Sequence, residues 1–307
     1  MFKLNAFVLL FFCLTQTACQ SVGNTLQVGQ SSPTSATTSS SEERTLENCG
    51  TQSSGELNAF FQDFRCVTLS RNGSNTQIFT QDLPPHRSHY YGANHPNYTP
   101  FDTRRGSNYH ANPNLLQTQS VTVSIPDQPV PRAHLKISSD LVDGVVGGQY
   151  DYPMGPVGVA LDGVLLFNPL AAPGDDIENE KYTFDSYNSH PEMRGAYHYH
   201  TVSRGPLEVL QKLGKITDPT PGAAKIEIYG MMCDGTVVLG CTEMNGDKPA
   251  TSDFDAQNGH VHDLKDASGK VLFANRYHSH VCEQGLNKLR KFTPEIQYYD
   301  RCTVTQK

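Results

Sequence analysis

The sequence lacks the short motifs that mark the commonest enzyme classes. It contains no Gly-x-Ser-x-Gly turn, no His-Glu-x-x-His helix and no glycine-rich nucleotide loop. A hydrolase, kinase or dehydrogenase built on one of these motifs is therefore not indicated. The sequence alone leaves open whether the protein is an enzyme.

Charged residues are also scarce, and positive charge is scarcer than negative charge. They make up 18% of the 307 residues, and the formal net charge is −7. Because nucleic acid would require a basic surface, we expect no nucleic-acid partner and consider a metal cation the more natural one. The apolar content is ordinary, which is enough to bury a sizeable core in one large or two closely packed domains.

Long hydrophobic runs are absent as well. The apolar run at residues 6–14 is too short to span a bilayer, but it follows Lys3 and ends before Ala18-Cys19. Residues 1–18 are therefore predicted to be an export signal. Residues 19–46 are rich in Ser and Thr, which predicts a flexible linker.

The position of Cys19 resembles that of the lipidated first residue of bacterial lipoproteins. We expect a lipid anchor on this residue, with simple secretion as the alternative. The protein is then exported, either to the bacterial cell envelope (as an outer-membrane lipoprotein, periplasmic or surface-facing) or to the medium. The folded domain is expected over residues 47–307.

Six cysteines follow the signal region, an even number that predicts three disulfides in an exported protein. Sequence does not fix their connectivity, and proximity suggests the pairs Cys49–Cys66, Cys233–Cys241 and Cys282–Cys302. A copper site that uses the Cys282 thiolate, with Met231 or Met232, is the alternative. We favour the disulfides because an oxidising compartment pairs thiols.

Patterns typical of helices are few. Residues 207–213, followed by Gly214, and residues 285–291 each predict one short helix. Short β-rich runs at residues 77–80, 121–125 and 134–137 lie between turn-forming clusters. The predicted fold is mainly β: a sandwich or distorted barrel built from a duplicated hairpin and His-x-His unit, with a few short helices.

That duplication is the strongest feature of the sequence. Two units, at about residues 156–202 and 226–282, carry the same three elements in the same order. The elements are an Asp-Gly pair between apolar runs (residues 162–163 and 234–235), a Phe-Asp-x-x-Asn-(Ser/Gly)-His element (residues 184–190 and 254–260) and a Tyr-His-x-His strand (residues 197–200 and 277–280). The Asp-Gly pairs predict hairpins with type I′ turns.

A His-x-His pair on a strand places both imidazoles on the same face of the sheet. The candidate metal ligands are therefore His198, His200, His278 and His280, with His190 and His260 as the next candidates. Imidazole suits copper, zinc, iron or nickel, and we favour copper or zinc. Because neutral histidine is the ligand, binding should weaken as the pH falls toward about 6.5.

Three points stay open at this stage. The two units could share one site about a two-fold axis, or each could build its own three-histidine site. Asp185 and Asp255 are either turn residues or partners that orient the ligating imidazoles. His86 is a secondary ligand candidate, and the acidic run at residues 175–180 is either a solvated face or a calcium site.

The repeated motif resembles the YHYH-domain family, over roughly residues 49–303 and most strongly over 156–282. The family is largely uncharacterised, so the resemblance implies an exported domain with suspected metal binding and supplies no reaction. The second copy departs from the pattern, because Ser279 replaces the second tyrosine. Its histidine element also lies seventeen residues before Tyr277, against seven for the first copy.

From these features we expect an exported, lipid-anchored protein that binds copper or zinc. Two alternatives stay open: a metal-dependent envelope enzyme, either an oxidoreductase or a hydrolase, and a metal-free structural or binding module. The membrane, through the lipid, and the metal ion are the expected partners, and protein partners are not indicated.

Overall fold

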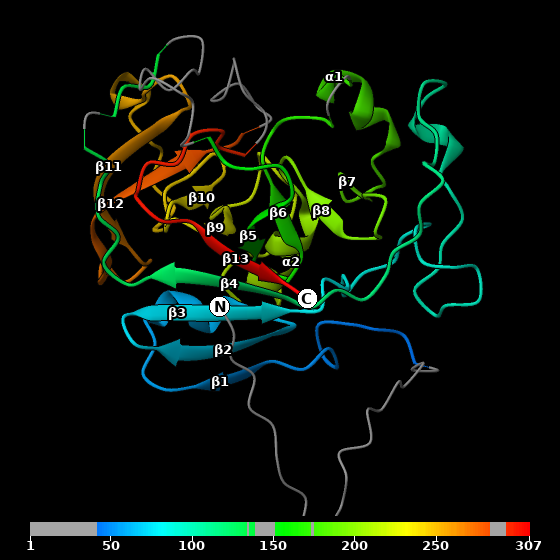
Figure 1. The fold of residues 1–307 in the computed structure, drawn as a ribbon, viewed down its shortest axis with the longest axis horizontal. Helices are drawn as coiled ribbons and strands as arrows, with labels where there is room; N and C mark the ends of the chain where they lie inside the picture. Colours follow the sequence, from blue (N-terminus) through cyan, green and yellow to red (C-terminus); the bar gives the residue numbers. More distant parts are fainter. Residues whose placement is uncertain (1–41, 134, 139–150, 173–174, 283–292) are drawn as a thin grey trace, which may run out of the picture. The chain divides into compact units, whose positions relative to one another are not determined.

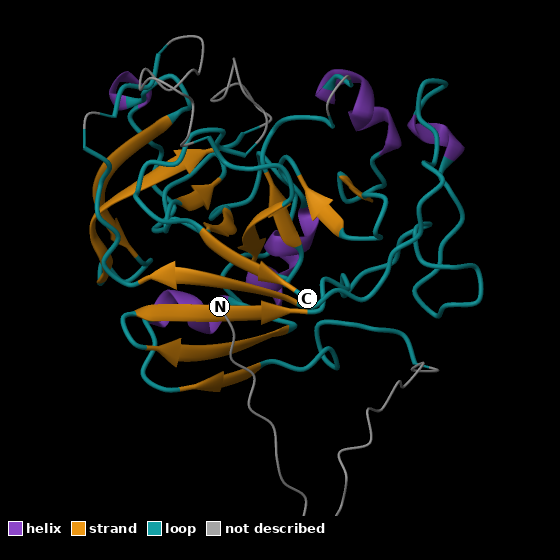
Figure 2. Ribbon diagram, viewed as in Figure 1, coloured by secondary structure: helices purple, strands orange, loops and turns teal. Residues whose placement is uncertain are grey.

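Strands dominate the part of the chain that the structure describes, and helices are few and short (Figure 2). The computed structural model describes residues 42–133, 135–138, 151–172, 175–282 and 293–307. The predicted signal at 1–18, Cys19, most of the linker and the predicted helix at 285–291 lie outside the described residues. None of the described helices has the length and apolar character needed to cross a bilayer.

The strands are β1 (Gln52–Ser54), β2 (Val67–Asn72), β3 (Asn75–Thr80), β4 (Val121–Pro126), β5 (Pro156–Ala160), β6 (Leu165–Phe167), β7 (Ser189–Pro191), β8 (Tyr197–Tyr199), β9 (Ile228–Met232), β10 (Val237–Leu239), β11 (Gly259–Lys265), β12 (Val271–His280) and β13 (Thr303–Gln306). The helices are α1 (Ile177–Glu180) and α2 (Arg204–Lys212), with 3-10 turns η1 (Ala59–Asp63), η2 (Thr103–Arg105), η3 (Lys181–Thr183) and η4 (Thr251–Asp253). The predicted strands at 77–80 and 121–125 are confirmed as β3 and β4.

These strands form two sheets. Five of them make one sheet in the order β1-β2-β3-β4-β13, and eight make the other in the order β11-β12-β10-β9-β5-β6-β8-β7 (Figure 1). Alternating residues of β4 are buried, which is the pattern of a strand with one face on a core. The mainly β prediction is confirmed, and the arrangement is sandwich-like rather than a closed barrel.

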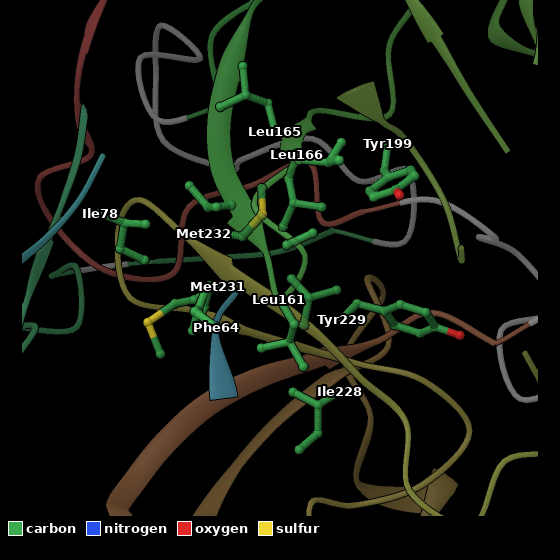
Figure 3. Packing of buried hydrophobic residues seen from close by; sticks show 14 of the residues in the cluster. Phe64, Ile78, Leu161, Leu165, Leu166, Tyr199, Ile228, Tyr229, Met231 and Met232 are labelled. Atoms are coloured by element: carbon green, nitrogen blue, oxygen red, sulfur yellow. The ribbon is translucent and has the colours of Figure 1, made fainter. Parts of the chain in front are cut away.

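Both sheets contribute to one hydrophobic core. Ile78 of β3, Phe64 and Met231 of β9 belong to the same buried cluster (Figure 3). Polar contacts also join the sheets, since the Thr80 hydroxyl donates to the Gly163 carbonyl and the Leu165 amide donates to Asp82 at 3.0 Å. Met231 and Met232 are fully buried, as expected of core methionines.

The eight-stranded sheet consists of two halves that repeat one strand order. In the first half β5 pairs with β6, β6 lies parallel to β8, and β8 pairs with β7. In the second half β9, β10, β12 and β11 correspond to β5, β6, β8 and β7. Each pair of neighbours is parallel or antiparallel as in the first half. The halves meet where β5 and β9 run antiparallel, so equivalent strands face each other across an approximate two-fold axis.

The Asp-Gly pairs form hairpins, but the predicted turn type is wrong. Gly163 and Gly235 have φ of +82° and +100°, whereas Asp162 and Asp234 have no positive φ. A type I′ turn needs positive φ at both central residues. The loop is one residue longer than expected, because the Ala160 amide bonds to the Val164 carbonyl at 2.8 Å. This is the three-residue hairpin loop in which only glycine takes the left-handed conformation.

Glycine is also needed where the two halves meet. A Cβ on Gly230 would lie 2.2 Å from the Val159 carbonyl oxygen and 2.7 Å from the Ala160 Cα, both backbone atoms of β5. We expect Gly230→Ala to destabilise the fold by about 3 kcal/mol, because the strands would have to separate. Chemical denaturation measures this. Gly92→Ala is the control, because no atom lies within 4 Å and its change should stay within about 0.5 kcal/mol; equal losses for both variants would contradict the close approach.

The predicted helix at 207–213 is confirmed as α2. Ser203 caps its first turn by accepting from the Gly205 amide at 3.1 Å, and Gly214 follows its end with φ of +72°. Leu207 and Leu210 are fully buried on its inner face. The helix therefore covers part of the core, and the strands that carry the histidines belong to the sheet.

Three disulfides are present, as predicted, but two of the three predicted pairs are wrong. Cys49–Cys66 is confirmed, and the other bonds join Cys233 to Cys302 and Cys241 to Cys282. In the β9–β10 hairpin, Met231 of β9 lies opposite Val237 of β10. Cys233 is therefore at the turn, whereas Cys241 lies beyond the far end of β10, so the two cysteines do not face each other.

Strand order explains the third bond. β10 and β12 lie parallel, with Leu239 opposite His280, and each strand is followed two residues later by a cysteine. Cys241 and Cys282 therefore meet, with Cα atoms 4.9 Å apart. Neighbours in the sheet decided this pairing, which sequence proximity could not reveal.

Candidate metal centres

Three histidines of the first half gather around β7 and β8. His190 of β7 lies directly opposite His198 of β8, and His200 follows β8 on the same face. We call His190, His198 and His200 the first cluster, and their ligand atoms all lie within 4.8 Å of one another. The Nε2 atom of His198 is 3.1 Å from that of His190 and 3.0 Å from that of His200.

The opposite ring nitrogen of each imidazole is held by an oxygen acceptor. Nδ1 of His198 contacts the Ala196 carbonyl at 2.9 Å, and Nδ1 of His200 contacts the Asn168 carbonyl at 2.6 Å. A carbonyl only accepts hydrogen bonds, so both of these Nδ1 atoms must carry the proton. Nδ1 of His190 lies 2.6 Å from the Thr183 hydroxyl, which donates its own proton to the Glu180 carbonyl and therefore accepts from His190. The neutral ring then presents a lone pair at Nε2, which is the form that binds metals.

Burial keeps these rings neutral. It lowers the pKa of His190 to about 3 and that of His200 to about 4, and it lowers the pKa of His198 well below the ordinary value. Three lone pairs thus converge with no proton between them, an arrangement that repels itself unless a cation lies among them. Bond lengths of 2.0–2.1 Å to a tetrahedral metal would set the nitrogens about 3.3 Å apart, close to the separations seen.

The second half builds an equivalent cluster with an added carboxylate. His260 of β11 lies opposite His278 of β12, and Glu243 reaches them from the segment after β10. We call Glu243, His260, His262 and His278 the second cluster, with His280 beside it. The Glu243 oxygens lie 3.2, 3.3, 3.3 and 3.4 Å from Nε2 of His260, His262, His278 and His280.

Backbone carbonyls orient this cluster as they do the first. Nδ1 of His278 contacts the Arg276 carbonyl at 3.0 Å, and Nδ1 of His280 contacts the Gly240 carbonyl at 2.8 Å. Within the described residues, Nε2 of His260 and of His278 are buried and have no well-formed hydrogen bond. Burial alone would raise the pKa of the Glu243 carboxyl, but the neighbouring imidazoles lower it, so the group is an ionised carboxylate.

The two clusters lie in different places. β8 and β12 are separated by β6, β5, β9 and β10, which is roughly 24 Å along the sheet at about 4.8 Å per strand. Figure 1 shows β7 and β8 at one end of this sheet and β11 and β12 at the other. The alternative in which both units share one site is therefore not what the structure shows, and each half gathers its own group of histidines.

Asp185 and Asp255 contact tyrosines rather than the histidine clusters. The Tyr197 hydroxyl donates to Asp185 at 2.6 Å, and the Tyr277 hydroxyl donates to Asp255 at 2.7 Å. Each aspartate also accepts from a backbone amide two residues ahead, as a turn residue does. Of the two roles left open by the sequence, the contacts fit the turn residue that also anchors the tyrosine face of the strand.

The phenylalanine of each Phe-Asp element forms a wall of its cluster. Phe184 packs edge-on to His190 at 4.9 Å between ring centroids, and Phe254 does the same to His260 at 4.8 Å. Phe254 also stacks on His280 at 5.0 Å. These rings exclude water from the imidazoles, which strengthens electrostatic interactions inside the clusters.

Sequence reasoning missed Glu243 and His262. His262 had a signal, since residues 260–262 form a third His-x-His pattern, and β11 confirms the alternation that puts both rings on one face. Glu243 had none, because only the path of the chain after Cys241 brings it to the histidines. Glu180, in the acidic run, also comes near a cluster, with a carboxylate oxygen 3.6 Å from Nε2 of His190.

His86 lies with tyrosines instead of with either cluster. Its ring stacks on Tyr187 with centroids 3.5 Å apart, and its Nε2 is 3.3 Å from the Tyr199 hydroxyl. Tyr199 points away from the histidine face of β8, because side chains alternate along a strand. Cys282 is in a disulfide, so the alternative copper site with a cysteine thiolate does not form.

The depressed pKa values revise the expected pH dependence. An ordinary histidine, with a pKa of about 6.5, would cost about 30-fold in affinity per ligand at pH 5. The first cluster, with values of about 3 and 4, still offers its lone pairs there. We expect the metal affinity of this cluster, measured by equilibrium dialysis of the His278→Ala protein, to change less than about tenfold between pH 7 and pH 5. A loss above about 1,000-fold would contradict the buried, neutral state.

Comparison with known proteins bears on the first half most directly. Residues 145–246 match the YHYH protein family. The YHYH resemblance is thereby confirmed over this stretch, which holds the first cluster, the hairpin of the second unit and Glu243. The YHYH match ends before β11 and β12, so the histidines of the second cluster lie beyond it. No curated protein and no solved structure matches the chain.

Proposed function

We propose that this is an exported metal-binding protein with two separate centres, one in each half of the eight-stranded sheet. The first cluster supplies the three imidazoles of His190, His198 and His200. The second supplies His260, His262 and His278 together with the Glu243 carboxylate, with His280 beside them. Copper or zinc is the metal proposed, because imidazole with or without carboxylate suits both.

One observation carries this proposal. In the first cluster the Nε2 atoms converge to 3.0 and 3.1 Å while carbonyls hold the Nδ1 atoms of His198 and His200. Histidines with a purely structural role would aim their free nitrogens at donors in the protein. The same arrangement recurs in the second half around a carboxylate, which argues against chance.

Metal analysis of protein purified without a histidine tag tests the proposal. Two equivalents of a first-row metal per chain are expected after dialysis against copper or zinc, and the titration that saturates at lower concentration identifies the preferred ion. Protein that takes up no metal above the level of a denatured control would favour the metal-free structural module.

Export and a lipid on Cys19 are part of the same proposal. Three disulfides suit an oxidising compartment, and the apolar run before Cys19 suits an export signal. Mass spectrometry of the mature N-terminus decides this. A lipid-modified peptide that begins at Cys19 is expected, and an unmodified N-terminus at another residue, from protein in the soluble fraction, would exclude the anchor.

A metal-dependent enzyme is the second candidate, and one observation favours it. The second cluster contains an exposed ligand, since the His262 side chain is 41% exposed. Catalytic metal sites differ from structural ones in keeping a position open to substrate.

A further inference from the structure

The two clusters differ in their access to solvent. His190, His198 and His200 of the first cluster are at most 3% exposed. In the second cluster His278 is equally buried, whereas the side chain of His262 is 41% exposed. The nearby carboxylates do not account for the difference, since Glu180 beside the first cluster is 20% exposed and Glu243 is 11% exposed. One side of the second cluster is therefore open, while the first is enclosed.

A pocket of about 290 Å³ lies on that open side. Glu243, His260 and His262 form part of its lining, so the pocket lies against the second cluster. Two buried apolar residues, Met244 and Leu264, form another part of the wall. The volume is at the lower end for ligand-binding pockets, which limits the occupant to a small molecule.

The charge at the metal end of this pocket favours a small anion. A divalent cation held by neutral imidazoles and the single carboxylate of Glu243 keeps a net positive charge. Lys248 and Lys265 also line the pocket, and among the described residues neither forms an ion pair. Asp247, Asp253 and Asp263 line the pocket as well and offset the charge of the two lysines. The attraction for an anion therefore comes from the positive charge of the metal itself.

We propose that the second cluster is an open metal centre that binds a small carboxylate through this pocket, whereas the first cluster is a closed centre. Carboxylate oxygen is a good ligand for copper and zinc, and the hydrocarbon part of the molecule would pack on Met244 and Leu264. The proposal rests on the proposed metal binding, and it assigns ligand exchange to one centre only.

The test uses the full-length protein in two half-site forms loaded with Cu²⁺. His198→Ala retains the second cluster, and His278→Ala retains the first. Bound copper is counted before any ligand is added, so a failure to bind metal is recognised as a failure of the proposed function. Azide, which gives a charge-transfer band when it binds Cu²⁺, is then titrated, and lactate is added as the competing carboxylate.

In the protein that retains the second cluster, we expect a saturable azide band that lactate displaces. In the protein that retains only the first cluster, azide should bind at least tenfold more weakly. If a half-site protein does not fold, the intact protein provides the answer, with one azide bound per two copper ions. The proposal would be overturned by equal azide binding at both centres or by the absence of a band at a copper-loaded second cluster. A band that lactate does not displace would overturn it as well.

Charge reversal in the pocket gives an independent measurement. Lys248→Glu changes a lining residue that is no metal ligand, and it should weaken lactate binding about three- to tenfold with copper content unchanged. Lys212→Glu is the matched control, since it makes the same charge change on α2 and should leave lactate binding unaltered. Equal effects of the two variants would overturn the assignment of the pocket.

Discussion

The His278→Ala protein is expected to bind one metal equivalent where the unaltered protein binds two. His278 is fully buried, and its Nε2 is 3.3 Å from a Glu243 oxygen, which places it inside the cluster rather than at its open edge. Loss of this ligand should weaken the second centre by more than about 100-fold, the upper range for losing only a residue that orients a ligand. Metal content after dialysis, with protein concentration from amino-acid analysis, measures the loss.

The matched variant is His198→Ala, at the equivalent place in the first half. His198 pairs with Leu165 of β6 as His278 pairs with Val237 of β10. We expect it to remove the other equivalent, and the double variant to remove both, because the clusters are on different strands of the sheet. Loss of both equivalents from either single variant would indicate one shared site, and retention of both by the double variant would show that the histidines are structural.

Removal of the Cys241–Cys282 disulfide is expected to weaken the second centre about 10- to 100-fold and leave the first unchanged. Cys241 lies two residues before Glu243, and Cys282 lies two residues after His280. The bond therefore ties the segment that carries the carboxylate to the strand that carries two imidazoles. Metal titration of the Cys241→Ser, Cys282→Ser protein measures the effect.

The control removes the disulfide that adjoins the other, five-stranded sheet. Cys49→Ser, Cys66→Ser opens a loop near β1 and β2 and should lower overall stability by about 2–4 kcal/mol without changing either metal affinity. If both double variants weakened the second centre equally, the Cys241–Cys282 bond would have no specific role in holding its ligands.

Much of the first cluster could be predicted from sequence because its signals are local. Period-two alternation puts His198 and His200 on one face, and the repeated element marks His190. The mainly β class was equally accessible, since β-rich runs and turn-forming residues alternate along the chain. These features depend on neighbours in sequence, which is what pattern reasoning can use.

The errors arose where strand order decides the outcome. The parallel pairing of β10 with β12 brings Cys241 to Cys282. In the sequence, however, Cys302 is closer to Cys282 than Cys241 is. The same pairing brings Glu243 to the histidines. Such contacts form between segments about forty residues apart, and their prediction would require the order of strands in the sheet.

The lengthened second copy shows how geometry survives a change in spacing. β11 and β12 extend as a long hairpin that absorbs the extra residues between His260 and Tyr277. His260 still faces His278, just as His190 faces His198. The cross-strand pair, rather than the spacing in sequence, is therefore what the two halves have in common.

Anomalous X-ray diffraction from crystals of the untagged protein, loaded with zinc and recorded on both sides of the zinc absorption edge, tests the two-centre account most directly. The account predicts two anomalous peaks per chain. One should lie within about 2.0–2.1 Å of Nε2 of His190, His198 and His200, and the other among Glu243, His260 and His278. A single peak between the two halves, or no peak at either cluster, would contradict it.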